Sequence, residues 1–240
     1  ECVSTSLGHS PLTSLNDPTC GSRNSIGEAL TNLIWCPLKN ELKSVSLSAN
    51  WMWPANNEGE NSRLYDAVKA CSDFCIELGI NVPTGKDSMS MKQKYPKEEV
   101  VSPGTVIISA TAHSDNFRKT VEPYLKEKNS NLYYINMSSC EYNLGGSALF
   151  QSNNKVGKKC NDIKSTKYFK KIFDSIQIAI KKDLIYSGHD ISSGGLITCL
   201  LEMCFVSDGL GLNVNLSNVD EKDIIKLLFS ENHGIIFQAN

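Results

Sequence analysis

Glu28 and Asn32, within the segment GEALTNL, carry side-chain oxygens of the kind that bind hard cations such as Mg²⁺. The two residues are four positions apart, so a helix would place them on one face. That face lies roughly opposite an apolar stripe that includes Ile26, Leu30 and Leu33. The spacing leaves two interpretations open: a solvated polar face or a cation site.

Asp190 and Ser192 form a second polar cluster, in the stretch GHDISSGG that directly precedes an apolar run. Gly194 and Gly195 would open a helix there, and the free amides of its first turn can meet a phosphate beside the Ser192 hydroxyl. The Asp190 carboxylate could then hold a metal ion. The alternative is that Asp190 or Ser192 simply caps the helix. His189 lacks a second histidine at the spacing of a zinc site, so zinc is not expected.

A third polar run, PTGKDSMSM, interrupts a segment that is otherwise typical of a strand. Lys86, Asp87 and Ser88 would place a positive charge, a carboxylate and a hydroxyl at a bend, where backbone amides could approach an anion. The run is not a Walker A loop, because Asp87 stands where that motif has Ser or Thr after the lysine. An ordinary hairpin-like turn accounts for the same residues, and this alternative stays open.

These polar runs depend on alternating helices and strands to position them. In the first half of the chain, Gly79 follows the clearest amphipathic helix and is expected to cap its C-terminus. Hydrophobic periodicity predicts, in order, a helix at 23–36, a strand at 43–53, a helix at 60–78, and strands at 80–93 and 100–112. The stretch before residue 23 is expected to be irregular.

The second half repeats this alternation after a charge-rich connector. The predicted elements are a strand at 131–137, helices at 166–182 and 194–205, a short strand, a helix at 221–229 and a last strand at 234–238. The order strand, helix, strand in both halves indicates an α/β (α+β) class. We therefore expect one domain at 1–115, a connector at 116–130 and a second domain at 131–240.

Composition argues against several functional classes. The 240 residues carry a net charge of −2 without a polybasic arm, so nucleic acid is not an expected partner. No apolar run approaches the roughly 20 residues that span a bilayer, so we expect no membrane partner and a cytoplasmic location. The nine cysteines include no CxxC pair, which favours reduced, buried, inert thiols over a disulfide framework or a metal cluster.

Seven segments, taken in order, resemble the synthetase portion of the phosphoribosylformylglycinamidine synthase family. They are GEALTNL, SANWMWP, LYDAVKACSDF, GKDSMSM, SPGTVIISA, LGGSALFQ and GHDISSGGLITCLLEMCF. The resemblance covers nearly the whole chain. In that family the synthetase region consists of two tandem repeats of the aminoimidazole ribonucleotide synthetase type, each with two α/β domains. The resemblance implies that this chain is most of the second repeat, with both domains incomplete.

The resemblance also implies roles for individual residues. It implies that Glu28, Asn32 and Asp190 bind Mg²⁺ and that Ser192 contacts an adenine nucleotide, ATP or ADP, so that ligands from both domains meet at one ion. Further nucleotide-binding candidates are Lys86, Asp87, Ser88, Gly194 and Gly195. Ser193 departs from the family pattern, because the family usually has an aspartate there. One negative charge beside the expected ion is therefore absent.

The implied reaction is the ATP-dependent conversion of formylglycinamide ribonucleotide to formylglycinamidine ribonucleotide in purine biosynthesis, with ammonia supplied from glutamine. The first synthetase repeat and a glutaminase domain would be partners within the parent chain. Without them, we expect this fragment alone to be inactive. In the alternative interpretation, the repeat holds its nucleotide as a structural scaffold and does not turn over substrate.

Overall fold

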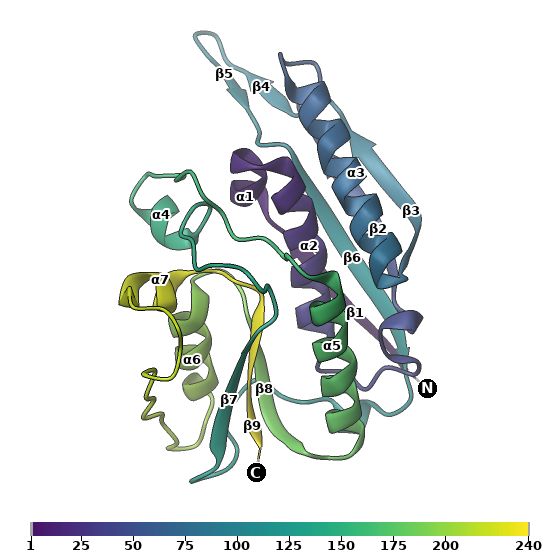
Figure 1. The fold of residues 1–240 in the computed structure, drawn as a ribbon. Coiled ribbons are helices and arrows are strands. Elements are labelled where there is room, and N and C mark those ends of the chain that lie inside the picture. The colour runs from purple at the N-terminus through teal and green to yellow at the C-terminus, as the bar shows by residue number, and fades with distance from the viewer. Residues whose placement is uncertain (1, 240) are drawn as a thin grey trace.

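The computed structural model describes residues 2–239, which form two main β-sheets with helices packed around them (Figure 1). The outer limits of the two expected domains, residues 1 and 240, lie outside the described residues. Between residues 2 and 239, no helix is both long enough and apolar enough to cross a membrane. The mixture of helices and strands confirms the expected α/β class.

The first sheet has four strands in the order β1-β6-β2-β3. These strands are β1 (Cys2–His9), β2 (Ser46–Met52), β3 (Asn81–Ser88) and β6 (Thr105–Ser114). β6 pairs antiparallel with β1 and β2, whereas β3 runs parallel to β2. A small antiparallel hairpin of β4 (Lys92–Lys94) and β5 (Glu99–Val101) projects from one end of this sheet (Figure 1).

Helices α2 (Pro18–Leu33) and α3 (Glu60–Leu78) share an apolar core with this sheet. α2 begins where it does because the Asp17 carboxylate accepts hydrogen bonds from two amides of the first turn. α3 ends where Gly79 adopts a left-handed conformation with φ of 75°, as its sequence predicts. The two helices lie on the same face, so the opposite face of the sheet stays open.

The second sheet has three strands in the order β7-β9-β8, each antiparallel to its neighbour. The strands and helices of this half are β7 (Asn131–Asn136), α4 (Ala148–Ser152), α5 (Thr166–Lys181), β8 (Ile185–Ile191), α6 (Gly195–Phe205), α7 (Ile224–Phe229) and β9 (Gly234–Ala239). Three short helical pieces, α1 (Pro11–Asn16), η1 (Glu41–Ser44) and η2 (Phe117–Lys119), lie in the first half and the connector. Leu196, Met203 and Leu227 belong to a second, separate apolar core.

α5 belongs by sequence to the second half but packs into the core of the first, beside α2 and α3 (Figure 1). Phe169 of α5 meets Phe74 of α3 edge to face, with ring centroids 6.3 Å apart. The buried Gln177 side chain accepts a hydrogen bond from the Leu38 amide at 2.8 Å. It also donates to two carbonyl oxygens of the segment that follows α2. The two halves are therefore joined by a shared core.

Several predicted elements differ from the observed ones. Residues 2–9 form β1 instead of an irregular segment, because their side chains alternate between α2 and the open face of the sheet. The helix expected at 23–36 is α2, which starts at Pro18 because Asp17 caps it. The short helix α1 precedes it, in the stretch expected to be irregular. The sequence does not predict β8, whose polar residues are held in a ladder with β9. The short strand expected after residue 205 is absent, since no strand lies between α6 and α7.

The predicted bend at Lys86, Asp87 and Ser88 is also wrong. These residues continue β3 as regular strand and pair in register with residues 50–52 of β2. The parallel ladder holds this backbone extended, so it forms no concave loop of amides for an anion. The strand predicted at 100–112 is divided into β5 and β6, with Pro103 in the break between them.

Candidate functional site

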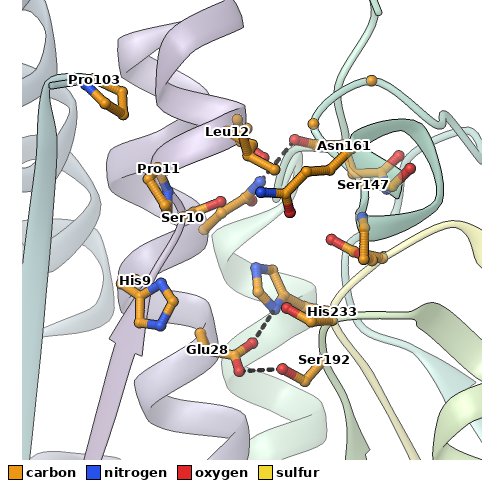
Figure 2. A pocket seen from close by; sticks show the side chains of 18 residues that line it. His9, Ser10, Pro11, Leu12, Glu28, Pro103, Ser147, Asn161, Ser192 and His233 are labelled. Atoms are coloured by element: carbon orange, nitrogen blue, oxygen red, sulfur yellow. Dashed lines mark hydrogen bonds and ion pairs between the residues drawn. The ribbon is translucent and has the colours of Figure 1, made fainter. Parts of the chain in front are cut away.

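A pocket of about 450 Å³ opens between the two halves of the chain (Figure 2). His9 and Glu28 line it from the first half, at the end of β1 and in the middle of α2. Ser147, Ser192 and His233 line it from the second half, before α4, after β8 and before β9. The end of β8 and the start of β9 are fixed side by side by their ladder, which brings Ser192 and His233 to the same wall.

A hydrogen bond across the pocket joins Glu28 to Ser192. The Ser192 hydroxyl donates to Glu28 Oε1 at 2.5 Å, although the two residues are 164 positions apart (Figure 2). The Glu28 side chain is only 19% exposed, so it is not part of a solvated helix face. Ser192 does not cap α6 either, because the N-cap residue is Gly194 and the Ser192 hydroxyl donates to Glu28. The two polar clusters therefore meet at one place.

The Glu28 carboxyl lies among other acids. Burial raises the pKa of Glu28 to about 7, the carboxylates of Asp190 and Glu231 act in the same direction, and the Ser192 hydrogen bond opposes them. Asp190 is 7% exposed, and burial raises its pKa as well. Buried carboxylates that disfavour one another's charge are stabilised when a cation joins them. Glu28 and Asp190 thus have the oxygen chemistry that a divalent cation needs, although only Glu28 of the two lines the pocket.

Three or more His, Cys, Asp or Glu side chains do not converge in a metal-binding cluster anywhere in residues 2–239. Glu28 and Asp190 are a pair of acids, and Mg²⁺ usually completes its shell with waters and phosphate oxygens. The pocket therefore suits an ion that arrives with a phosphate ligand better than an ion bound by protein alone.

His233 is a buried pocket residue that sequence reasoning missed. The residue is 5% exposed, and its Nδ1 lies 3.8 Å from Glu28 Oε2 (Figure 2). Neither ring nitrogen has a hydrogen-bond partner among the described residues. Burial lowers the pKa of His233 to about 4, so the ring is neutral at pH 7 and contributes no positive charge to the acids.

Glu231 is a second missed residue, and it occupies the start of α6. Its Oε1 accepts hydrogen bonds from the backbone amides of Gly194, at 2.8 Å, and Ala148, at 2.7 Å. Burial raises the pKa of Glu231, and these two amides oppose that effect. The carboxylate thus binds the Gly194 amide that the sequence suggests for a phosphate. Gly194 and Gly195, both in left-handed conformation, do not line the pocket.

The other sequence candidates lie outside this pocket. Asn32 is exposed one turn beyond Glu28 and lines a separate surface hollow with residues of β1, β2 and β6. Lys86, Asp87 and Ser88 lie on β3 at the edge of the first sheet, where the Lys86 ammonium donates to the Ser88 hydroxyl. The structure therefore places Glu28 and Ser192 in one pocket. Asp190 lies close enough to raise the pKa of Glu28 but does not line the pocket, and Asn32 and the β3 residues lie apart from it.

One sequence signal could have found Glu231 and His233. Both belong to the run SENHG, which places polar residues immediately before the apolar strand β9. Polar residues directly before an apolar run are the same signal that identified Asp190 and Ser192. The sequence alone does not tell which two strand ends become neighbours.

Family models match both halves of the chain. The model described as the FGAR-AT PurM N-like domain matches residues 2–113. The model described as the C-terminal domain of AIR synthase related protein matches residues 137–239.

Curated relatives are similar along the whole chain. Phosphoribosylformylglycinamidine synthase of Homo sapiens is 39% identical over 239 residues, which are 99% of this chain and 18% of that protein. A probable phosphoribosylformylglycinamidine synthase of Arabidopsis thaliana, named as chloroplastic/mitochondrial, is 39% identical over 236 residues, 98% of this chain and 17% of that protein. The chain therefore spans less than a fifth of the length of these relatives.

Solved structures share the fold at low sequence identity. T. maritima PurL complexed with FGAR has a TM-score of 0.73 at 13% identity and covers 99% of this chain and 38% of its own. T. maritima PurL complexed with AMPPCP has a TM-score of 0.71 at 11% identity, and the match covers 99% of this chain and 36% of the PurL chain. Thiamine monophosphate kinase of Aquifex aeolicus has a TM-score of 0.55 at 13% identity, with 99% and 78% covered.

Proposed function

This chain belongs to the phosphoribosylformylglycinamidine synthase family, and from that premise we propose that it contributes a Mg²⁺-dependent adenine-nucleotide site to a longer enzyme. The observation that carries the proposal is the hydrogen bond between Ser192 and Glu28. It joins the two polar clusters in one pocket between the halves of the chain. The structural relative T. maritima PurL is described in complexes with ATP and ADP, which supports the choice of ligand.

In this proposal Glu28 and Asp190 hold the ion, and Asn32 reaches it only if the end of α2 rearranges. The ion would neutralise phosphate charge, which is the chemistry that Mg²⁺ supplies in phosphoryl transfer. Ser192 keeps Glu28 oriented, because its hydroxyl donates a hydrogen bond to Glu28 Oε1. The neutral His233 ring fills the wall behind Glu28 without competing with the ion for the carboxylate.

Glu231 changes the expected role of the glycine pair. The Gly194 amide already binds the Glu231 carboxylate, so a phosphate at that amide would first have to displace it. We therefore keep Gly194 and Gly195 as nucleotide-binding candidates of lower rank than Ser192. Lys86, Asp87 and Ser88 contribute only if a missing part of the parent chain forms a second site along β3.

The whole reaction and its partners belong to the parent enzyme. We propose that the parent is an ATP-dependent ligase that makes formylglycinamidine ribonucleotide, and that this segment alone turns over no substrate. The open face of the first sheet favours the proposal that another part of the parent chain covers it, because the apolar side chains of Val3 and Leu7 are 61% and 60% exposed there. The first synthetase repeat is the proposed occupant of that face, and a glutaminase domain is the proposed source of ammonia. The cytoplasmic location stays a prediction, which imaging of the tagged full-length protein would check.

A second candidate function is a structural nucleotide site. Two observations favour it: Ser193 supplies no charge to the ion, and Glu231 occupies the first amide of the α6 turn. In this case the nucleotide stabilises the fold and the reaction takes place at another site of the parent chain.

Glu28→Gln and Asp190→Asn in the intact parent enzyme distinguish the two functions. Affinity for ATP and ADP is measured by calorimetry with and without Mg²⁺, together with turnover under saturating substrate. Both substitutions should weaken Mg²⁺-dependent nucleotide binding about tenfold or more, because each removes a charged ligand. Turnover that falls with binding supports the catalytic function, whereas normal turnover with a lower melting temperature supports the scaffold. Unchanged binding in either variant contradicts the metal assignment. Glu77→Gln, the same change on the exposed face of α3, is the matched control.

A further inference from the structure

Glu231 connects two turns that line the nucleotide pocket. One is the α4 turn, residues 145–148, and the other is the α6 turn, residues 192–194. A single oxygen of the Glu231 carboxylate, Oε1, accepts hydrogen bonds from one backbone amide of each turn. The Ala148 amide nitrogen lies 2.7 Å from this oxygen, and the Gly194 amide nitrogen lies 2.8 Å from it. Glu231 therefore holds together two segments that are far apart in the sequence.

Each of these turns also contacts the first half of the chain. The α4 turn packs against α1, because a Cβ at Gly146 would lie 2.9 Å from the Thr13 amide nitrogen. The α6 turn contacts α2, because the Ser192 hydroxyl donates to Glu28 Oε1 at 2.5 Å (Figure 2). The two turns thus meet the first half on two different helices. The distance between the turns consequently sets the width of the pocket between the halves.

Other backbone hydrogen bonds keep the shape of each turn but do not link the two. In the α4 turn, the Gly145 amide donates to the Lys159 oxygen and the Gly146 amide to the Val156 oxygen, both at 2.8 Å. In the α6 turn, the Ser192 oxygen accepts from the Gly195 amide at 3.0 Å. These partners come from the segment that carries the turn itself. The Glu231 carboxylate is the contact that extends from one turn to the other.

The geometry favours a role for the acceptor oxygen over a role for the charge. Both hydrogen bonds go to the same oxygen, and both donors are neutral backbone amides. An uncharged carboxamide oxygen has the two lone pairs that these donors need. If a phosphate displaced Glu231 from the Gly194 amide, the contact between the two turns would be lost. Glu231 is therefore better suited to shaping the pocket than to reserving a place for a phosphate.

We propose that Glu231 is a positioning residue, which holds the α4 turn and the α6 turn at the separation that the nucleotide needs. It acts through its acceptor oxygen and touches neither the ion nor the nucleotide. The inference rests on the proposed nucleotide function of the pocket.

The test compares Glu231→Ala with Glu231→Gln in the intact parent enzyme. Affinity for ADP with Mg²⁺ is measured by calorimetry, at a temperature where circular dichroism shows that every variant stays folded. Glu231→Ala should weaken binding about tenfold, because both turns lose their common acceptor. Glu231→Gln should stay within about threefold of wild type, because its carboxamide oxygen accepts both hydrogen bonds. Glu77→Ala, on the exposed face of α3, is the control and should bind ADP as wild type does.

Hydrogen exchange of the nucleotide-free enzyme gives a second readout that does not depend on ligand binding. In Glu231→Ala, peptides that contain the Ala148 and Gly194 amides should exchange about tenfold faster, because these amides lose their acceptor. Glu231→Gln should restore the wild-type exchange. If exchange follows this pattern while the wild-type enzyme binds no ADP, the proposed nucleotide function fails and the link between the turns stands.

Three results would overturn the inference. Equal losses of affinity in Glu231→Gln and Glu231→Ala would show that the charge acts and not the acceptor oxygen. Unchanged affinity in Glu231→Ala would show that the pocket does not need the link. Tighter binding by Glu231→Ala would identify the carboxylate as an internal substitute for a phosphate, which the ligand has to displace.

Discussion

At the scale of residues, opposite charges secure the junction between the halves while like charges gather in the pocket. Arg23 and Asp162 illustrate the first case, since the Asp162 side chain is 5% exposed and still ionised through its partners. Burial opposes ionisation of Asp162, but hydrogen bonds from Arg23 and Lys164 outweigh it and hold the pKa below its ordinary value. A carboxyl whose pKa is depressed on folding stabilises the folded state above its unfolded pKa.

The first prediction follows from this ion pair. Arg23→Met should lower the free energy of unfolding by about 2–3 kcal/mol at pH 7, because it leaves a buried carboxylate with a weaker set of partners. The difference from wild type should be constant above the unfolded pKa of about 4 and should shrink as the pH falls through the depressed pKa of Asp162. Urea unfolding at a series of pH values measures it.

The control for this prediction is the exposed pair Lys69 and Asp73, whose side chains are 59% and 54% exposed. Lys69→Met should leave the free energy of unfolding close to the wild-type value at any pH, as is usual for solvated pairs. An Arg23→Met effect that is equally large in acid would mean that the guanidinium acts through packing and not through its charge.

Residue chemistry was readable from sequence where it was local. Glu28, Asp190 and Ser192 stand in unusually polar positions beside apolar runs. The structure joins Glu28 to Ser192 by a hydrogen bond and places Asp190 close enough to raise the pKa of Glu28. Asn32 lies one helical turn after Glu28, but the pocket does not extend as far as that turn. The spacing of residues along one helix does not tell how far the other half of the chain covers it. Glu231 was missed because its partners come from two other segments.

At the scale of elements, α6 depends on a close backbone approach at its first residue. Gly195 has a φ of 75°, and a Cβ at this position would lie 2.8 Å from the Leu228 and Ser230 carbonyl oxygens. These are backbone atoms at the end of α7, so they cannot rotate away. Because Gly195 has no side chain, the turn that carries Ser192 and the start of α6 can pack directly against the end of α7.

The second prediction is that Gly195→Ala destabilises the fold by several kcal/mol, since it adds a backbone clash to the cost of a left-handed alanine. Gly209→Ala is the matched control, because Gly209 also has a positive φ, of 67°, but a Cβ there would meet nothing within 4 Å. It should cost about 1–2 kcal/mol, the conformational part alone. Equal losses in urea unfolding would show that the contact with α7 is unimportant.

Helices and strands were predictable where a long periodic pattern of apolar residues ended at a clear termination signal such as glycine. α3 runs from Glu60 to Leu78, as the apolar period and Gly79 predict. β1 was missed because serine and threonine dilute its alternation, although it pairs with β6 along its whole length. β8 was missed because its polar residues resemble a loop, and pairing with a strand more than forty residues later decides its structure.

At the scale of the whole molecule, one polar side chain links the two halves inside their shared core. The third prediction is that Gln177→Leu, similar in volume, lowers the free energy of unfolding by about 2–4 kcal/mol. It leaves the Leu38 amide and two carbonyl oxygens buried without their partner. Ser175→Ala, on the exposed face of the same helix, should change it by less than about 0.5 kcal/mol. If Gln177→Leu leaves the free energy of unfolding unchanged, apolar packing alone joins the two halves.

The central claim is that Glu28 and Asp190, from opposite halves, hold one ion in the pocket with a nucleotide beside Ser192. The most direct test is a crystal of the parent enzyme grown with ADP and Mn²⁺ in place of Mg²⁺, with anomalous scattering used to locate the metal. We predict an anomalous peak between the Glu28 and Asp190 carboxylates and nucleotide phosphates on the side of Ser192. Bound nucleotide in this pocket without metal at those carboxylates, or a manganese peak elsewhere with the pocket empty, would contradict the claim.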